Sequence, residues 1–205
     1  MRILPLIHTG MVCLWLGGCA VAGIGATEPP ATFNLSAPDL SNSKFRRWPV
    51  QITVSQPTAM RALDTDRVLV MASGGRIAYF EDAAWSDRLT SLVRARIVEA
   101  MQDSQAFRAV LTTEDRVDGE YTLAIEIRKF EVEVADGRSE AVVTLFVKLI
   151  DHIGSSVIAT KQFSARSPAS SDDPANGIIA LQNDFNQVTE QLVKWLSSRR
   201  GRGSA

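Results

Sequence analysis

One cysteine near the start of the chain has neighbours that suit covalent modification of its thiol. Cys19 follows Leu16, Gly17 and Gly18 at the end of an apolar segment. A peptidase that cuts before Cys19 must approach the backbone closely, and the two glycines leave room for it. The thiol is a nucleophile that can accept a diacylglyceryl group, after which Cys19 becomes the first residue of the mature chain. The spacing therefore predicts a lipid anchor at Cys19.

The segment 1–18 has the composition of a secretory signal. Its charged residue is Arg2, and an apolar run interrupted by Pro5 follows. The run is shorter than the roughly 20 apolar residues of a spanning helix, whereas a basic start, a short apolar core and a small-residue exit are typical of signal peptides. With Cys19 behind it, the segment resembles the lipobox signal of bacterial lipoproteins. An ordinary signal, or a buried first helix, with an incidental cysteine is the alternative.

Composition limits the mature chain to a few classes. With 205 residues, 45% hydrophobic and 22% charged, the chain has the make-up of one globular domain. Removing Arg2 leaves 21 basic against 23 acidic residues, a net charge of −2, which argues against general nucleic-acid binding. Cys13 leaves with the signal and Cys19 is acylated, so no disulfide is expected and the core alone must stabilise the domain.

The order of segments predicts a tethered domain. Residues 19–32 are rich in small residues and end near Pro29-Pro30, which is typical of a flexible tether that stiffens toward the domain. Residues 33–198 form the single domain, and the basic, glycine-rich residues 199–205 are expected to be a disordered tail.

The first half of the domain combines strands with one amphipathic helix. Strands are expected at 33–35 and 50–54, and a hairpin at 67–80 turns at the glycines of Ser73-Gly74-Gly75. Apolar residues then recur every three or four positions after Glu81 and Asp82, which predicts a helix over about 82–104. A short strand is expected at 107–111.

The second half reads as a meander followed by a helix. Apolar residues change parity within 121–134 at Arg128-Lys129, which predicts a β-bulge, and Asp136-Gly137 predicts a hairpin turn. Strands at 141–149 and 157–163, a loop at 164–176 and a helix with apolar residues from Ile178 to Leu196 complete the domain. The predicted fold is α+β, a mainly antiparallel sheet with two amphipathic helices packed on one face.

Candidate catalytic residues are few. His152 stands alone in a turn once His8 leaves with the signal, and the composition offers neither a cysteine nucleophile nor a zinc ligand set. Glu131 and Glu133 share one strand face; a solvated face is the favoured interpretation, and a carboxylate-pair hydrolase the alternative. We therefore expect no enzyme, no metal and no cofactor.

Tryptophans are the remaining candidates for ligand contacts. Trp85 and Trp195 fall on apolar stripes and are expected in the core. Trp48 lies off any stripe, so it could be either a contact residue or a core residue.

A series of short patterns follows the predicted lipobox. They are Phe33-Asn34-Leu35, an alternating strand from Val50 to Pro57, Arg67-Val68-Leu69-Val70, Ile77-Ala78-Tyr79-Phe80, and Trp85, Leu89 and Leu92. This series resembles the ABC-type transport auxiliary lipoprotein family, the lipoprotein partners of MCE-type lipid transporters of the paraquat-inducible protein C type. The resemblance implies a non-catalytic protein, lipid-anchored at the periplasmic face of the outer membrane. Its implied partners are a periplasmic MCE-domain protein, an ABC permease and an ATPase.

Two further expectations complete this interpretation. Ala20 after Cys19 resembles the outer-membrane sorting pattern, and exposed sheet edges with the 67–80 hairpin could support a homo-oligomer. The alternative function is a lipoprotein activator of a cell-envelope (peptidoglycan) synthesis enzyme.

Overall fold

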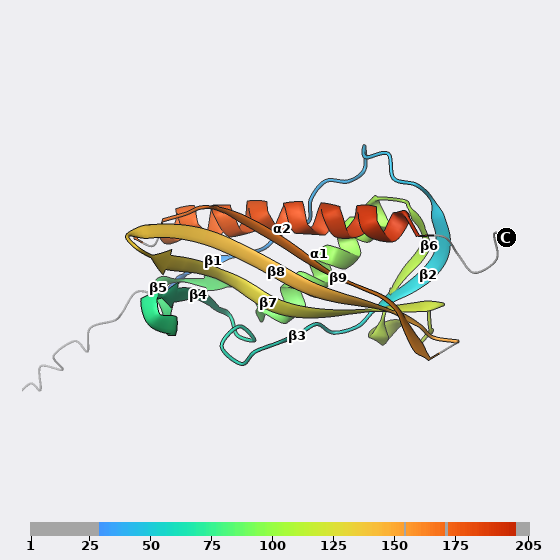
Figure 1. The fold of residues 1–205 in the computed structure, drawn as a ribbon, viewed down its shortest axis with the longest axis horizontal. Helices are drawn as coiled ribbons and strands as arrows, with labels where there is room; N and C mark the ends of the chain where they lie inside the picture. The colour runs from blue at the N-terminus through green and yellow to red at the C-terminus, as the bar shows by residue number, and fades with distance from the viewer. Residues whose placement is uncertain (1–28, 154, 171, 200–205) are drawn as a thin grey trace, which may run out of the picture.

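The computed structural model describes residues 29–153, 155–170 and 172–199. The predicted signal, the lipobox with Cys19, most of the tether and the end of the tail lie outside these residues. In the part described, the domain is elongated, with the hairpin of β4 (Arg67–Ala72) and β5 (Arg76–Trp85) at one end and the C-terminal turn of α2 (Pro174–Ser197) at the other (Figure 1). The fold class is α+β, as predicted.

In the described residues, a mixed sheet of nine strands is organised around β7, Tyr121–Ala135. On one side of β7 lie two strands in antiparallel order, β8 (Arg138–Asp151) and β9 (Ser156–Pro168). On its other side three short strands pair with it one after another, β2 (Trp48–Val54), β3 (Thr58–Ala59) and β4 (Arg67–Ala72). The sheet continues with β6 (Phe107–Thr112) beside β2, and with β5 (Arg76–Trp85) and β1 (Ala31–Phe33) beyond β4.

The prediction of a mainly antiparallel sheet is wrong. Among the described residues, five strand pairings are parallel (β1–β5, β2–β6, β2–β7, β3–β7 and β4–β7) and three are antiparallel (β4–β5, β7–β8 and β8–β9). The reason lies in β2, β3 and β4, which pair one after another with successive stretches of β7, and all three run in its direction. Alternating apolar residues look the same in parallel and antiparallel strands, so the pattern carries no direction.

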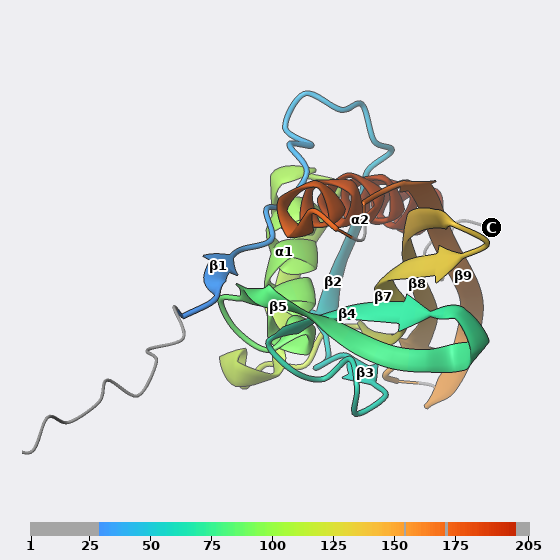
Figure 2. The same ribbon diagram turned by 90° about the vertical axis from the view of Figure 1, so that its left-hand side faces the viewer.

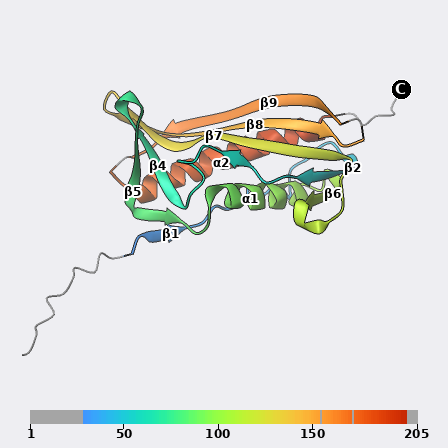
Figure 3. The same cartoon turned by 90° about the horizontal axis from the view of Figure 1, so that it is seen from below.

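Two helices cover the concave face of the curved sheet, as Figures 2 and 3 show. They are α1, Leu89–Asp103, and α2, Pro174–Ser197. The α2 helix starts where the Asp173 carboxylate accepts hydrogen bonds from the backbone N–H groups of Ala175 and Asn176, at 3.0 and 3.3 Å. Neither helix of the described residues is long and apolar enough to cross a membrane.

The start of the first helix differs from the prediction. Residues 81–85 belong to β5, and α1 begins only at Leu89. Phe33 of β1 pairs with Trp85 and Arg67 of β4 pairs with Ala84, so two neighbouring strands hold this stretch extended. The Trp85 side chain is buried four residues before Leu89, a spacing that fits a helical stripe as well as an inward strand position. Strand pairing, which the spacing does not record, decides between them.

Several local predictions are confirmed. The β7–β8 register shifts between Ile127 and Lys129, at the predicted bulge, so buried residues change parity there. Asp136 and Gly137 have φ values of 52° and 71°, as a tight hairpin turn requires. The bounds of the loop predicted at 164–176 are wrong, in contrast, because β9 extends to Pro168 and α2 begins at Pro174.

Aromatic rings connect the layers of the core. The Trp85 ring of β5 lies 5.8 Å from that of Phe130 in β7, which lies 6.0 Å from that of Phe185 in α2. All three side chains are buried. This row ties the sheet to α2 and fixes the faces on which the remaining side chains lie.

Candidate functional site

The two glutamates singled out in the sequence lie on the convex face of β7, away from the helices. Glu131 stands beside Leu69 of β4 and across from Val142 of β8, and it is only 3% exposed. Glu133, two residues on, remains partly exposed. The expectation of a solvated strand face is therefore wrong for Glu131, because strands on both sides of β7 shield it.

Glu133 is engaged by two cations. Its Oε1 accepts a hydrogen bond from Lys129 Nζ at 2.5 Å, and its Oε2 lies 2.8 Å from a guanidinium nitrogen of Arg166, which also pairs with Glu140 at 2.6 Å. Burial alone would raise the pKa of Glu133, but hydrogen bonds from Lys129 and Arg166 outweigh it and lower the pKa. Burial raises the pKa of Glu131, and the nearby charge of Glu133 adds to this while Lys129 opposes it.

Two carboxyls with pKa values shifted apart are the arrangement that acid–base catalysts use. Here, however, both oxygens of Glu133 are occupied by Lys129 and Arg166, so neither is directed at an approaching substrate. The geometry fits an ion-pair network that holds β7, β8 and β9 in register better than a nucleophile and its acid partner.

Glutamine at these two positions is expected to change stability in opposite directions. Folding raises the pKa of Glu131, so the folded chain holds the proton of this carboxyl more tightly than the unfolded chain does. The free energy of unfolding therefore falls as the pH rises from the ordinary glutamate pKa through the raised value. Glu131→Gln should therefore be more stable than the wild type at about pH 7, and should lose this advantage below about pH 4.

Glu133→Gln is the matched variant. The lowered pKa of Glu133 means that its stabilising contribution is present above the ordinary glutamate pKa and is lost as the pH falls through the lowered value. At about pH 7 the variant should lose up to about 1 kcal/mol for each partly exposed ion pair. Urea midpoints at about pH 7 measure both effects, and midpoints down to about pH 3 follow their loss; shifts of the same sign in the two variants at about pH 7 would contradict these environments.

The histidine and tryptophans take positions that decide the open questions. His152 is exposed in the turn after β8, with Nε2 3.7 Å from Asp118 Oδ2, as expected of a surface residue. Trp48 is a core residue: it is buried, 4.9 Å from the ring of Tyr121 and 6.4 Å from that of Phe107. Trp85 is fully in the core, and Trp195 packs at its margin against Phe163 at 5.7 Å.

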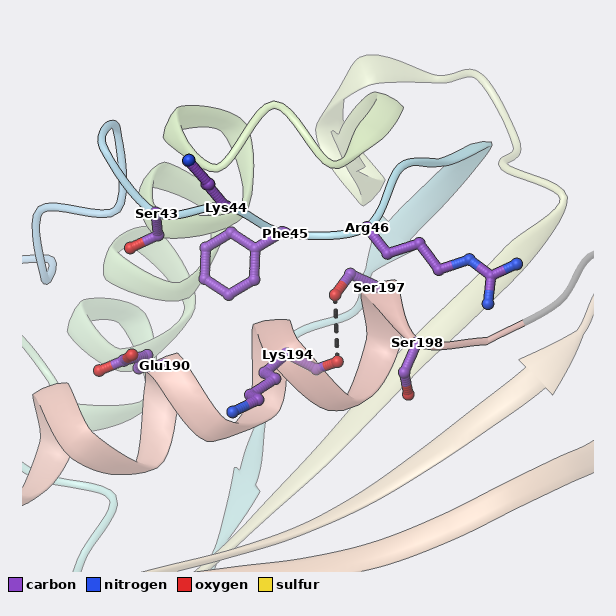
Figure 4. A pocket seen from close by; sticks show the side chains of 8 residues that line it. All are labelled: Ser43, Lys44, Phe45, Arg46, Glu190, Lys194, Ser197 and Ser198. Atoms are coloured by element: carbon purple, nitrogen blue, oxygen red, sulfur yellow. Dashed lines mark hydrogen bonds between the residues drawn. The ribbon is translucent and has the colours of Figure 1, made fainter.

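The structure adds a cleft between the segment before β2 and the C-terminal half of α2. It has a volume of about 400 Å³ and is lined by Ser43, Lys44, Phe45, Arg46, Glu190, Lys194, Ser197 and Ser198. The ring of Phe45 projects toward α2, with Glu190 and Arg46 at opposite ends of the cleft (Figure 4). We call this the basic cleft, because three of its lining residues are cations and one is an anion.

The cations of the basic cleft belong to the basic residues that form no ion pair in the described part of the chain. Within the described residues, Lys44, Arg46 and Lys194 have no carboxylate within ion-pair distance. Elsewhere in this part of the chain carboxylates pair with Arg88, Arg94, Arg96, Arg108, Arg128, Lys129 and Arg166. The charges of the cleft are thus available to a ligand.

Sequence patterns did not indicate the basic cleft. Lys44 and Arg46 lie in a stretch without strand or helix periodicity, and Lys194 is far away in the sequence on the polar side of a helical stripe. The local signal in the sequence is the density of positive charge in Lys44-Phe45-Arg46-Arg47, which could have indicated one wall of the cleft. Cys19, Leu16, Gly17 and Gly18 lie outside the described residues, so the lipid anchor stays a prediction.

The chain is similar to known bacterial proteins in sequence and in structure. It is similar to an uncharacterised protein of Bradyrhizobium diazoefficiens, with 26% identity over 175 residues; these cover 85% of this chain, which spans about half (47%) of that relative's length. A crystal structure of a protein from Xanthomonas campestris is similar at 28% identity and a TM-score of 0.74, over 81% of this chain and 94% of the other.

A second solved structure supports the fold alone. It is a crystal structure of an uncharacterised protein with 13% identity and a TM-score of 0.61, over 82% of this chain and 99% of the other.

Residues 33–193 match the model of a family described as ABC-type transport auxiliary lipoprotein component.

Proposed function

Because the chain belongs to the ABC-type transport auxiliary lipoprotein family, we propose that it is the outer-membrane, non-catalytic auxiliary of an MCE-type lipid transporter. It would be held at the periplasmic face by lipid on Cys19. Its partners would be a periplasmic MCE-domain protein with an ABC permease and an ATPase.

The observation that carries this proposal is the extent of the family match. It runs from the last residue of β1 to Val193 in α2, so it includes the sheet and both helices. The occupied oxygens of Glu133 add support for a role without catalysis. Within residues 29–153, 155–170 and 172–199, no group of three or more histidine, cysteine, aspartate or glutamate residues is placed to hold a metal ion.

The shape of the domain supports a linking role. The described chain begins at the end that carries the β4–β5 hairpin, while the turn between β8 and β9 lies at the opposite end (Figure 1). A tether from Cys19 would therefore reach the membrane from the hairpin end. The β8–β9 end would then point away from the membrane, toward a periplasmic partner.

Site-specific crosslinking in the native host tests the proposal. A photo-crosslinking amino acid is placed at Ile153 (82% exposed) at the far end, or at Ile77 (41% exposed) in the hairpin as the matched position. We expect adducts with the MCE-domain protein from Ile153 and fewer from Ile77, identified by mass spectrometry. Recovery of a peptidoglycan synthase instead, with no transporter component at either position, would favour the alternative function.

A further inference from the structure

The basic cleft has a fixed frame. Phe45 packs against the core, while Leu40 before it and Trp48 after it are buried. The backbone N–H of Phe45 donates to the Ser43 carbonyl at 3.1 Å, and that of Trp48 donates to the Ala106 carbonyl at 2.7 Å. Buried Leu40 on one side and Trp48 on the other thus attach the segment to the domain, and the local hydrogen bond at Phe45 fixes the turn between them, so the charged side chains start from a defined backbone.

The polar groups of the cleft favour an anion over a neutral ligand. The hydroxyls of Ser197 and Ser198 already donate to the backbone carbonyls of Lys194 and Trp195, at 3.0 and 2.7 Å. Donation to a ligand is therefore left mainly to the guanidinium of Arg46 and the ammonium groups of the lysines. Arg199, whose guanidinium stacks 4.3 Å from the Trp195 ring, adds positive charge at the same end of α2.

The position of the one carboxylate narrows the binding region further. Figure 4 shows Glu190 at the far end of the cleft from Arg46, with Lys194 between them on α2 and its side chain directed toward the Glu190 end. An anion is repelled from the Glu190 end and attracted to the Arg46 end. The Phe45 ring, next to these cations, offers an apolar surface to whatever carries the anionic group.

We propose that the basic cleft binds a phosphate ester, with the phosphate at the guanidinium of Arg46, the flexible Lys194 side chain turned toward it, and its organic part against Phe45. A guanidinium donates two parallel hydrogen bonds to phosphate oxygens, and a lysine adds a mobile point charge. Lys44 points away from α2 in Figure 4 but is exposed on a flexible stem, so it can approach a bound anion. The phosphate could belong to a lipid headgroup or to a small soluble ester.

Native mass spectrometry of the full-length protein, released from non-ionic detergent micelles, tests the site. The protein is titrated with phosphatidylglycerol, with diacylglycerol of the same acyl chains, and with glycerol 3-phosphate. We expect saturable binding of one molecule of a phosphate-bearing compound and none of diacylglycerol, with binding that weakens as ionic strength rises. Binding of both phosphate compounds indicates a headgroup site, and binding of glycerol 3-phosphate alone indicates a soluble ester.

Two double variants make the test specific. Arg46→Gln with Lys194→Gln should weaken binding by about an order of magnitude, since each exposed charge contributes up to about fivefold. Arg138→Gln with Lys148→Gln removes the same residue types from exposed positions of β8 and should bind like the wild type. Equal binding by both variants, equal uptake of diacylglycerol and phosphatidylglycerol, or no binding of any phosphate compound would overturn the proposal. The measurement needs no transporter, so its failure is separate from failure of the proposed function.

Discussion

Replacement of Cys19 by serine is expected to move the protein from the membrane fraction to the soluble fraction and to abolish its labelling by palmitate. A serine hydroxyl does not form the thioether that would carry the diacylglyceryl group. Each buried methylene of an acyl chain contributes about 0.8 kcal/mol, so two or three chains hold a protein firmly at the membrane. A protein without acyl chains loses this binding energy. Neither helix of the described residues could span the membrane in their stead.

Cys13→Ser is the matched control for this experiment. Cys13 lies inside the apolar segment, six residues before Cys19, and is expected to leave with the signal. This variant should therefore retain wild-type labelling and membrane retention. Undiminished palmitate labelling of Cys19→Ser would show that the lipid is attached elsewhere and that the lipobox interpretation is wrong.

Features set by neighbouring residues were predictable from the sequence. The parity change at Arg128-Lys129 requires an extra residue in any strand with one buried face, and the bulge occurs there. The same holds for the Asp136-Gly137 turn, since few residue pairs accept two positive φ angles. In both cases the physical cause acts within a few residues, so a short pattern contains it.

Features set by distant segments were not predictable. The parallel direction of β2, β3 and β4 follows from their alignment along β7, and the extended form of residues 81–85 follows from pairing with β1 and β4. Glu131 is buried for a similar reason, because its neighbours on both sides come from other strands. A pattern of alternating residues reports which face is apolar, but not which strand will cover the other face.

The basic cleft depends even more strongly on segments that are distant in the sequence. Its two walls lie about 150 positions apart in the chain, in residues 43–46 and 190–198. Neither wall has a motif of its own, and the charges of each look like ordinary solvated residues in isolation. The unpaired state of the cations becomes visible only when the surrounding carboxylates are placed in space.

Replacement of Phe130 by alanine is expected to destabilise the domain by about 3–5 kcal/mol, the usual cost of deleting a buried aromatic ring. Phe130 is 1% exposed, and its ring lies between those of Trp85 in β5 and Phe185 in α2. Its removal leaves a cavity where the sheet meets the helix, and rings held by three different elements cannot move together to fill it. Urea unfolding should show a lower midpoint with an unchanged slope.

Phe146→Ala provides the comparison that makes this result informative about the bulge. Phe146 lies on the convex face of β8, half-buried, with the guanidinium of Arg128 4.0 Å from its ring, and its loss should cost about 1 kcal/mol. Phe146 pairs with Glu126, and without the extra residue between Ile127 and Lys129, position 130 would share the face of position 126. Phe130 would then lie on the convex face with Phe146, and the two variants would lose similar amounts. A large difference between two identical substitutions is therefore the signature of the bulged register, and equal losses would exclude it.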